Sequence, residues 1–462
     1  MKFRKFLEEL ERRGELRRVK KEVDIKFEST AILKRAERER GPAIFFEKLK
    51  GYPQRSMVGN LFSTEERIAL AMGAREGIPP RKAAAERLME LYAAAPQAVK
   101  PPKLVETSPA KEVILKEDFD LMREIPVPTH CEKDGGPYIA AGVVIAKHPD
   151  TGERIVQIIE MQVKGKSKIA ISPVLPLMPQ AFARAEEMGK PLEIAIAIGV
   201  EPALLLAAAT APEIAALDKY ELASLFSGEP LEIVRAETVD LEIPADAEFV
   251  IEGEVIPGAR ESMGPYGDYL RTYYWVESKP VIEAKAITMR KEPIYQDILA
   301  DGLETVLLVA LPNEVELLRK LKSLFPFVED VYLTRSSSSH HAIISVRKMR
   351  DEDIRPLINW TLATATLVKH LIVVDADDVD PTNPDEVEWA LVTRVRADKD
   401  VVIIPGFYGS PLDPSSEKGF WTKMGIDATR PLTVPRERFE KSDVPSEVKR
   451  KVEERWEDYF KE

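Results

Sequence analysis

Two carboxylic acids flank a Gly-Pro turn in the segment Glu261–Asp268. Carboxyl groups placed in this way can act as general acids or bases, because they exchange a proton at accessible pH. Met263 lies between them and offers only a soft apolar surface, which cannot transfer a proton. In an extended segment Glu261 shares the face of Met263 and can serve there as an acid. The alternative is a solvated glutamate in a turn over residues 258–261, and the sequence leaves both open.

Three other groups of residues invite a metal-binding or nucleophilic interpretation. The adjacent histidines of Ser336–His341 would point to opposite faces of a strand and could not bind one ion together, so a polar turn before a strand at 342–346 is favoured. The acidic run Asp375–Asn383 lacks the spaced glycine and final glutamate of an EF-hand loop, which indicates a turn at a strand end. Cys131, the single cysteine, excludes internal disulfides. Beside His130 it is either a reactive thiol or, as we favour, a small loop residue.

The composition describes a globular protein of more than one domain. Its 462 residues are too many for one simple core, and 44% hydrophobic with 31% charged residues is typical of a water-soluble chain. A net charge of −12 argues against nucleic acid as a partner, since a phosphate backbone requires a basic surface. Residues 1–21 predict an amphipathic helix and not a secretion signal, and no apolar run is long enough to cross a membrane. We therefore expect a cytoplasmic protein, and the many Glu, Lys and Arg residues favour a thermophile.

The pattern of apolar residues changes along the chain. Residues 1–105 alternate helices with short strands, and Ser63–Glu66 has the spacing of a capping box, which predicts a helix that ends near Met72. Residues 106–305 are rich in strands separated by Gly and Pro, which indicates an antiparallel, barrel-like sheet. Its main strands are expected at 142–146, 155–163, 192–197 and 249–255, and its helices at 178–188 and 216–226.

Residues 306–462 alternate strands with helices, which predicts a smaller α/β layer. Strands are expected at 330–333, 342–346, 371–375 and 401–404, and helices at 314–322, 356–369 and 384–393. A charged amphipathic helix is expected at 446–460. It packs either on its own chain or on a neighbouring subunit, and the sequence does not decide between the two.

Eight short segments, in one order over nearly the whole chain, resemble the UbiD family of prenylated-flavin-dependent carboxy-lyases. They are Phe3–Leu10, Val58–Phe62, Gly136–Tyr138, Ala197–Ala203, Gly264–Asp268, Asp377–Pro381, Gly409–Pro414 and Lys423–Thr429. The resemblance implies an α/β (α+β) fold with an N-terminal α/β segment (1–105), a split β-barrel that binds flavin (106–305) and a smaller C-terminal α/β domain for oligomerisation (306–462). A homo-oligomer, either a dimer or a hexamer, is the expected assembly.

The family binds the phosphate of prenylated FMN through a divalent metal, usually manganese, that is held by an Asn, a His and a Glu. By this resemblance Ile155 takes the place of the Asn, no histidine occurs in Ser172–Pro176, and Lys219 takes the place of the Glu. An ammonium group has no lone pair to offer a metal ion. The resemblance thus implies prenylated FMN, contacted by Met263, Lys219 and Lys423, whereas the substituted ligands predict no manganese site.

In the family an arginine orients the substrate, and an acid pair flanks the Gly-Pro turn. Asp268 keeps one of these acids, Met263 replaces the other, and Glu160 stands in place of the arginine. Two charges about 4 Å apart interact by roughly 4 kcal/mol at a dielectric constant near 20, so an ionised Glu160 would repel a substrate carboxylate. We expect Glu160 to pair with Lys219 in the space of the metal and the arginine. Lys423 keeps the position of a phosphate-contacting lysine, with loop packing as the alternative.

Three functions follow, and the candidate catalytic residues are Asp268, Glu261 and Glu160. The first function is a carboxy-lyase acting on an unsaturated or aromatic small-molecule acid, such as a phosphorylated isoprenoid precursor. The second is a non-catalytic structural or regulatory subunit beside an active paralogue of the same family. The third is a binding protein that uses the altered pocket for another ligand, with Lys219 and Lys423 as anion contacts.

Overall fold

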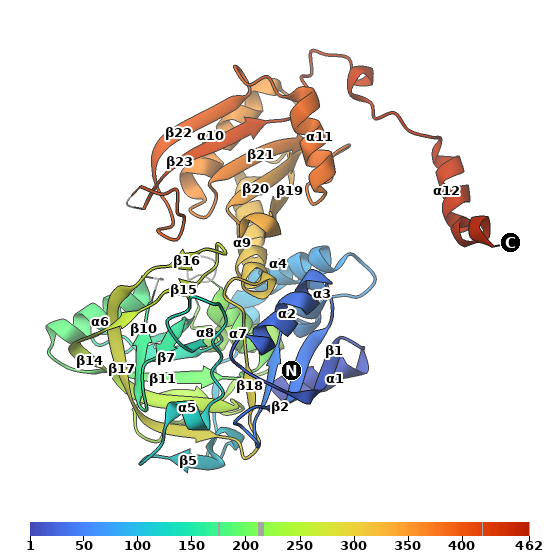
Figure 1. The fold of residues 1–462 in the computed structure, drawn as a ribbon. Helices are drawn as coiled ribbons and strands as arrows, with labels where there is room; N and C mark the ends of the chain where they lie inside the picture. The colour runs from blue at the N-terminus through green and yellow to red at the C-terminus, as the bar shows by residue number, and fades with distance from the viewer. Residues whose placement is uncertain (174–175, 211–216, 418, 462) are drawn as a thin grey trace. The chain divides into compact units, whose positions relative to one another are not determined.

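A computed structural model describes residues 1–173, 176–210, 217–417 and 419–461 (Figure 1). The chain divides into two compact units. The first consists of Met1–Lys320, Leu333–His341 and Tyr408–Trp421, and the second of Leu321–Tyr332, Ala342–Phe407 and Thr422–Glu462. All candidate site residues except Lys423 belong to the first unit.

A four-stranded sheet and four helices make up the N-terminal part of the first unit. The sheet has the order β1-β2-β3-β18, so its last strand comes from much later in the chain. Apolar residues at helical spacing, from Phe3 to Leu10, form the buried face of α1 and confirm the predicted amphipathic helix. The strands are β1 (Leu16–Val23), β2 (Ala43–Leu49), β3 (Ser56–Gly59) and β18 (Ile294–Gln296), and the helices are α1 (Phe3–Arg12), α2 (Glu28–Arg38), α3 (Glu65–Ala71) and α4 (Pro80–Ala98).

Helix α3 begins one residue later than the capping-box spacing predicts. Its N-cap is Thr64, whose hydroxyl accepts a hydrogen bond from the backbone N–H of Arg67 at 3.3 Å. Ser63 is buried, and its hydroxyl accepts from the Arg67 guanidinium at 2.7 Å. The side chain of Ser63 therefore serves a tertiary contact, and the neighbouring threonine caps the helix.

Replacing Thr64 with Ala is expected to lower the free energy of unfolding by about 1 kcal/mol, because the first turn of α3 loses a hydrogen-bond acceptor. Urea unfolding followed by circular dichroism measures the change. Thr64→Ser keeps an accepting hydroxyl and is the matched control, expected to stay within about 0.5 kcal/mol of the parent protein. An equal loss in both variants would contradict the capping role.

Nine strands form one open, curled sheet, which agrees with the split barrel that the sequence predicts (Figure 1). The strand order is β6-β9-β10-β17-β14-β11-β7-β8, and β5 pairs with β17. Strand β11 is buried on both faces, because Ile194 and Ile196 lie in one core and Ala195 and Ala197 in another. The strands are β5 (Val113–Leu115), β6 (Tyr138–Ile139), β7 (Val143–Lys147), β8 (Arg154–Ile158), β9 (Met161–Val163), β10 (Lys168–Ile171), β11 (Leu192–Ile198), β14 (Phe249–Met263) and β17 (Glu277–Met289).

Short helices and strands accompany this sheet. Helices α7 and α8 pack on each other and on β8, and α6 packs on β11 and β14. Helix α8 begins at Lys219, because the carboxylate of Asp218 caps it by accepting from the N–H of Tyr220 at 2.8 Å; residue 216, where the predicted helix began, lies outside the described residues. The helices are α5 (Leu121–Glu124), α6 (Leu177–Glu187), α7 (Pro202–Ala209) and α8 (Lys219–Ser227), and the strands are β4 (Lys103–Leu104), β12 (Glu232–Arg235), β13 (Glu242–Pro244), β15 (Tyr266–Gly267) and β16 (Tyr273–Tyr274).

Two strands of the barrel differ from the prediction, and both differences concern the site. Strand β14 does not end near Val255 but continues to Met263, because residues 260–263 pair with residues 277–280 of β17 after an irregularity in the register. The expected turn at 258–261 is therefore part of a strand. The single strand expected at 155–163 is divided into β8 and β9, and Glu160 lies in the gap between them.

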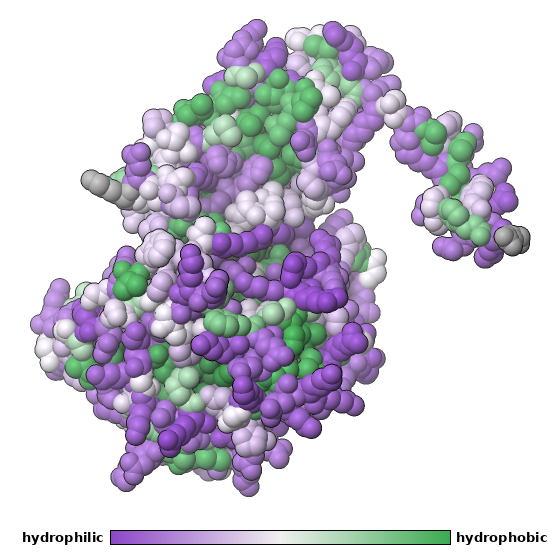
Figure 2. Space-filling model, viewed as in Figure 1, coloured by the Kyte–Doolittle hydropathy of each residue, from purple (hydrophilic) through white to green (hydrophobic). Residues whose placement is uncertain are grey.

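A five-stranded sheet with the order β19-β20-β21-β23-β22 forms most of the second unit, as the α/β pattern predicts. On the face drawn in Figure 2 this unit carries a broad apolar area, and it exposes large apolar side chains such as Val392 and Ile403. The strands are β19 (Val328–Leu333), β20 (His341–Val346), β21 (His370–Asp375), β22 (Val401–Tyr408) and β23 (Phe420–Asp427). The helices are α9 (Leu303–Leu324), which begins in the first unit, α10 (Ile354–Thr364), α11 (Pro384–Arg394) and α12 (Ser446–Glu454), which buries no residue. Within the described residues, no helix is both long and apolar enough to cross a membrane.

Candidate active site

The turn that carries Met263 and Asp268 is held by hydrogen bonds from both sides. The Gly264 N–H donates to Oε1 of Gln162, a buried residue of β9, at 3.1 Å. The backbone N–H of Asp268 donates to the carbonyl of Thr272 at 3.0 Å and closes the loop that follows. The end of β14 and strand β9 are thereby joined at the point where the candidate acids lie.

Asp134 ties a second loop to this turn. One carboxylate oxygen of Asp134 accepts the N–H of Gly267 at 2.9 Å. The other accepts the backbone N–H groups of His130 at 3.2 Å and Cys131 at 2.8 Å. One side chain thus satisfies three backbone donors from two segments far apart in sequence, which fixes the turn against the loop.

The loop and the turn approach so closely that only glycine fits at position 135. A Cβ on Gly135 would lie 2.2 Å from the carbonyl oxygen of Gly264. The Gly135 N–H donates to the carbonyl of Pro265 at 2.8 Å, and the hydroxyl of Tyr138 donates to the same carbonyl at 3.2 Å. The ring of Tyr138 stacks on that of Tyr266, with 4.2 Å between centroids.

Glu160 and Asp268 form a coupled pair of carboxyl groups. Burial, together with the nearby charge of Asp268, raises the pKa of Glu160 to about 8. Partial burial and the charge of Asp301 raise the pKa of Asp268, against the opposing effect of the Tyr269 N–H, which donates to its carboxylate at 2.6 Å. Two such groups cannot both ionise easily, so they retain a proton near neutral pH. The pair can therefore donate a proton to a substrate or hydrogen-bond a carboxylate.

Replacing Glu160 with Gln is expected to change how stability depends on pH. The pKa of Glu160 rises from an ordinary 4.5 to about 8 on folding, so the folded parent binds the extra proton and loses stability as pH rises through this window. The Gln variant carries no such proton, so its stability relative to the parent is expected to be about 4 kcal/mol greater at pH 9 than at pH 5, at about 1.4 kcal/mol for each pKa unit. Urea unfolding of both proteins at the two pH values measures this, and parallel pH curves would contradict it.

Lys34 and Asp301 lie beside the site, and no motif in the sequence indicates them. Lys34 Nζ lies 2.5 Å from Asp301 Oδ2 and 3.8 Å from Cys131 Sγ. Burial and the charge of Asp301 raise the pKa of the Cys131 thiol to about 11, so the thiol stays protonated, as expected of a loop residue rather than a nucleophile. Lys34 comes from α2 and Asp301 precedes α9, so only the tertiary fold brings them together.

Glu261 lies at the surface, and the strand that carries it is anchored to α6. Its side chain is 37% exposed, and its Oε1 lies 3.7 Å from Lys168 Nζ.

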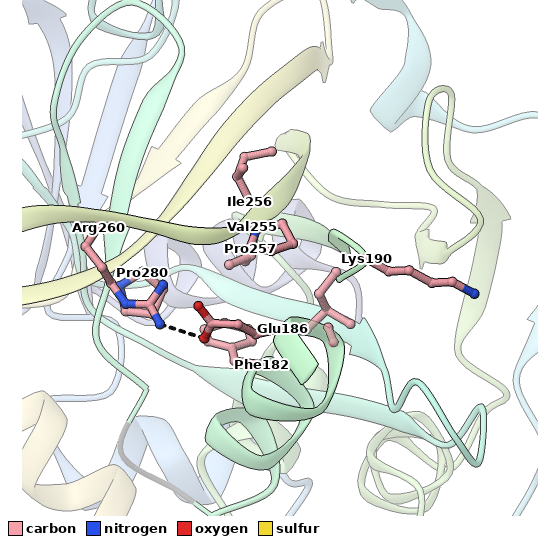
Figure 3. A pocket seen from close by; sticks show the side chains of 10 residues that line it. Phe182, Glu186, Lys190, Val255, Ile256, Pro257, Arg260 and Pro280 are labelled. Atoms are coloured by element: carbon pink, nitrogen blue, oxygen red, sulfur yellow. Dashed lines mark hydrogen bonds and ion pairs between the residues drawn. The ribbon is translucent and has the colours of Figure 1, made fainter. Parts of the chain in front are cut away.

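Glu186 pairs with Arg260 at 2.7 Å and accepts the Gly258 N–H at 2.8 Å, across the small recess drawn in Figure 3. The ion pair between Glu186 and Arg260 in this recess anchors β14 to α6. The geometry supports the solvated interpretation of Glu261.

Three family models match successive parts of the chain. They describe the N-terminal domain, the Rift-related domain and the C-terminal domain of 3-octaprenyl-4-hydroxybenzoate carboxy-lyase, and they match residues 7–91, 103–302 and 306–428. The chain belongs to the UbiD family. The resemblance found in the sequence is thereby confirmed.

Relatives in this UbiD family include decarboxylases from two archaea. The anhydromevalonate phosphate decarboxylase of Methanothermobacter thermautotrophicus is 37% identical over 416 residues, which cover 90% of this chain and 94% of the relative. The enzyme of the same name from Methanosarcina mazei is 32% identical over 450 residues, 97% of this chain and 100% of the relative.

Solved UbiD-class structures share the fold over nearly the full length. The enzyme HmfF from Pelotomaculum thermopropionicum, in complex with FMN, superimposes with a TM-score of 0.90 and 40% identity over 97% of this chain and 98% of that one. The vanillic acid decarboxylase of Sedimentibacter hydroxybenzoicus gives a TM-score of 0.85 and 31% identity over 99% and 98%.

The two residues that the sequence resemblance assigns to metal-ligand positions, Ile155 and Lys219, have side chains that do not fit a divalent ion. Ile155 is buried in the barrel core, and Lys219 is buried with its ammonium donating to the carbonyl of Thr210 at 2.6 Å. A hydrocarbon and an ammonium offer no ligand atom to manganese. The expected pairing of Lys219 with Glu160 stays a prediction, because the printed contact of the ammonium is the one to Thr210. Within the predicted histidine-free segment, residues 174 and 175 lie outside the described residues.

A flavin ring, in contrast, fits the polar groups of the barrel. Both amide atoms of Gln157 on β8 are buried without a hydrogen-bond partner in the described chain. The amide nitrogen is a donor and the amide oxygen an acceptor, which matches the alternating donors and acceptors on the polar edge of an isoalloxazine ring. Buried amides normally have hydrogen-bond partners. The buried amide of Gln157 is therefore suited to hold such a ring.

Lys423 lies in the second unit and has a structural environment of its own. Its buried ammonium donates to the carbonyls of Leu362 and Ala365, both at 2.9 Å, and lies 5.0 Å from the ring centre of Phe407. Burial lowers the pKa of Lys423 to about 8. These contacts support the packing interpretation, in which Lys423 closes the end of α10.

Proposed function

We propose that this protein is a prenylated-flavin-dependent carboxy-lyase that removes carbon dioxide from a small unsaturated acid, with Asp268 and Glu160 as its acid pair. The observation that carries the proposal is that Glu160, between β8 and β9, lies within electrostatic reach of Asp268 on the Gly-Pro turn, and that burial raises the pKa of both carboxyl groups. Loss of carbon dioxide leaves an electron pair on carbon, which must take up a proton. A carboxyl pair that retains a proton near neutral pH can supply it, in place of the acid that Met263 replaces.

The same pair offers a way to bind an acidic substrate at a position where the family has an arginine. A protonated Glu160 donates a hydrogen bond to a substrate carboxylate, whereas an ionised one repels it. Binding should therefore weaken as pH rises through the pKa of about 8. The bound prenylated flavin supplies the electron sink for decarboxylation, and Gln157 is the residue that we assign to its ring.

The substrate we propose is a phosphorylated isoprenoid precursor, anhydromevalonate phosphate. Two relatives that cover nine-tenths or more of this chain are named as decarboxylases of that compound. We also propose a homo-oligomer, which would cover the apolar area on the second unit (Figure 2). Native mass measurement tests the assembly, and a monomer at micromolar concentration would contradict it.

The test of the activity uses protein co-expressed with a flavin prenyltransferase. A flavin band in the visible spectrum of the purified protein, with release of carbon dioxide from anhydromevalonate phosphate, is the expected result. A colourless protein that releases no carbon dioxide would overturn the proposal.

A second candidate function is a non-catalytic subunit beside an active UbiD paralogue, and the side chains at the metal-ligand positions, Ile155 and Lys219, favour it. Co-expression with a paralogue from the same source separates the two candidates. Co-purification, with a higher rate in the complex than in the paralogue alone and no activity of this chain by itself, would support the second. Independent turnover by this chain would support the first.

A further inference from the structure

The hydroxyl of Tyr266 is buried without a hydrogen-bond partner in the described chain. The side chain is 4% exposed and belongs to the short strand β15 within the candidate turn. Its stacking neighbour Tyr138 has a hydroxyl of its own, but that group donates to the carbonyl of Pro265. Of two tyrosines packed face to face, one hydroxyl is thus satisfied by the protein and the other is not.

An unpartnered hydroxyl in a buried place is unfavourable, and either a water molecule or a bound ligand can satisfy it. The surroundings of Tyr266 indicate the kind of partner. Its ring packs in a small cluster with Met263, Ala170 and Ala300, which offers an apolar wall. The charges of Glu160 and Asp268, added to burial, raise the pKa of Tyr266, so the hydroxyl lies within electrostatic reach of the acid pair.

The acid pair alone is a poor receptor for an anion. Glu160 and Asp268 hold a proton between them near neutral pH, but each loses donor ability when it ionises. The tyrosine hydroxyl remains a donor throughout this range, because its pKa lies far higher. A suitable ligand has an anionic oxygen that faces the acid pair and the Tyr266 hydroxyl. Its hydrocarbon part packs against the apolar wall at Met263.

We propose that Tyr266 is a further substrate-binding residue, whose hydroxyl donates a hydrogen bond to an oxygen of the substrate's carboxylate. This inference rests on the proposed carboxy-lyase function, since it takes the acid of that reaction as the ligand. The hydroxyl thereby supplies a fixed donor at a site where the family uses an arginine. It acts together with protonated Glu160, which is the pH-dependent donor.

The test compares the unaltered chain with Tyr266→Phe, which keeps the ring and its stacking but removes the donor. Anhydromevalonate phosphate is titrated by calorimetry into full-length protein purified without the prenyltransferase, so that the acid is not consumed. The dissociation constant is expected to rise about 10- to 100-fold in the variant, as for loss of a hydrogen bond to a charged group. The melting temperature is expected to stay within about 2 °C, because the protein itself loses no bond.

The matched control is Tyr295→Phe. Tyr295 is fully buried in the barrel core beside Phe249, and its hydroxyl likewise has no partner in the described chain. The control removes the same atom from a buried tyrosine that is affected by the charge of Asp297 and not by the acid pair, and the affinity is expected to stay unchanged.

The outcomes separate this inference from the proposed function. An unchanged affinity of Tyr266→Phe, or an equal loss in Tyr295→Phe, would overturn the role of Tyr266 and leave the carboxy-lyase proposal intact. Weaker binding by Tyr266→Phe alone, in a protein that never releases carbon dioxide when loaded with flavin, would support the binding role and overturn the carboxy-lyase. If the unaltered chain does not bind the acid, the role of Tyr266 is overturned, and carbon dioxide release by the flavin-loaded protein decides the carboxy-lyase proposal.

Discussion

Asp268→Asn is expected to lower the rate of carbon dioxide release about 1000-fold, within the 10²- to 10⁴-fold range of a lost general acid. The amide keeps the shape of the side chain and can still accept from the Tyr269 N–H. It cannot return a proton to carbon, and it breaks the coupling that holds a proton on Glu160. Initial rates at pH 7, normalised to bound flavin, measure the effect.

The same change at Glu261 separates the two candidate acids. Glu261 is partly exposed and paired with Lys168, so Glu261→Gln is expected to alter the rate less than about twofold. A large loss at Glu261 with a small one at Asp268 would reverse the assignment of the acid. A small loss of rate in both variants would exclude the pair of Asp268 and Glu160 from the mechanism.

Gly135→Ala is expected to lower the free energy of unfolding by about 3 kcal/mol and to abolish ligand binding. The added methyl group would lie 2.2 Å from the carbonyl oxygen of Gly264, so the loop and the candidate turn must move apart. That movement stretches the bond from Gly135 to Pro265. Thermal and urea unfolding, together with calorimetric binding of the acid, measure both effects.

Gly165→Ala is the matched control for this change. No atom lies within 4 Å of a Cβ at Gly165, and its backbone needs no glycine. The free energy of unfolding of the Gly165→Ala variant is expected to stay within about 0.5 kcal/mol of that of the parent protein. If Gly135→Ala is as mild as Gly165→Ala, the close approach of loop and turn is not required.

The sequence predicts the fold well where local pattern and tertiary pairing agree. The apolar stripe of α1 is recognisable from its helical period, and strand β11 is recognisable as a short apolar run between Pro191 and Gly199. The extension of β14 to Met263 is not, because residues 260–263 are strand only through their pairing with β17. The gap at Glu160 is likewise set by the sheet and not by composition.

The candidate site is predictable to the extent that its residues lie in a recognisable segment. The resemblance picks out Asp268 and Glu160, which the structure brings into one electrostatic pair. It does not show that the ammonium of Lys219 donates to the carbonyl of Thr210, because positions in a motif do not reveal where a side chain points. Lys34 and Tyr266 are missed for a different reason. Lys34 meets the site only through tertiary packing, and Tyr266 differs from a phenylalanine by one hydroxyl whose surroundings the sequence does not show.

The gap between β8 and β9 makes residue 160 an attractive starting point for engineering. Glu160 belongs to neither strand and takes no part in the pairing of β7 with β8 or of β6 with β9. A library of all amino acids at this one codon would sample new preferences for cationic, neutral or anionic compounds on an unchanged scaffold. Residue 160 is thus a single position at which a substitution would change the charge of the proposed site.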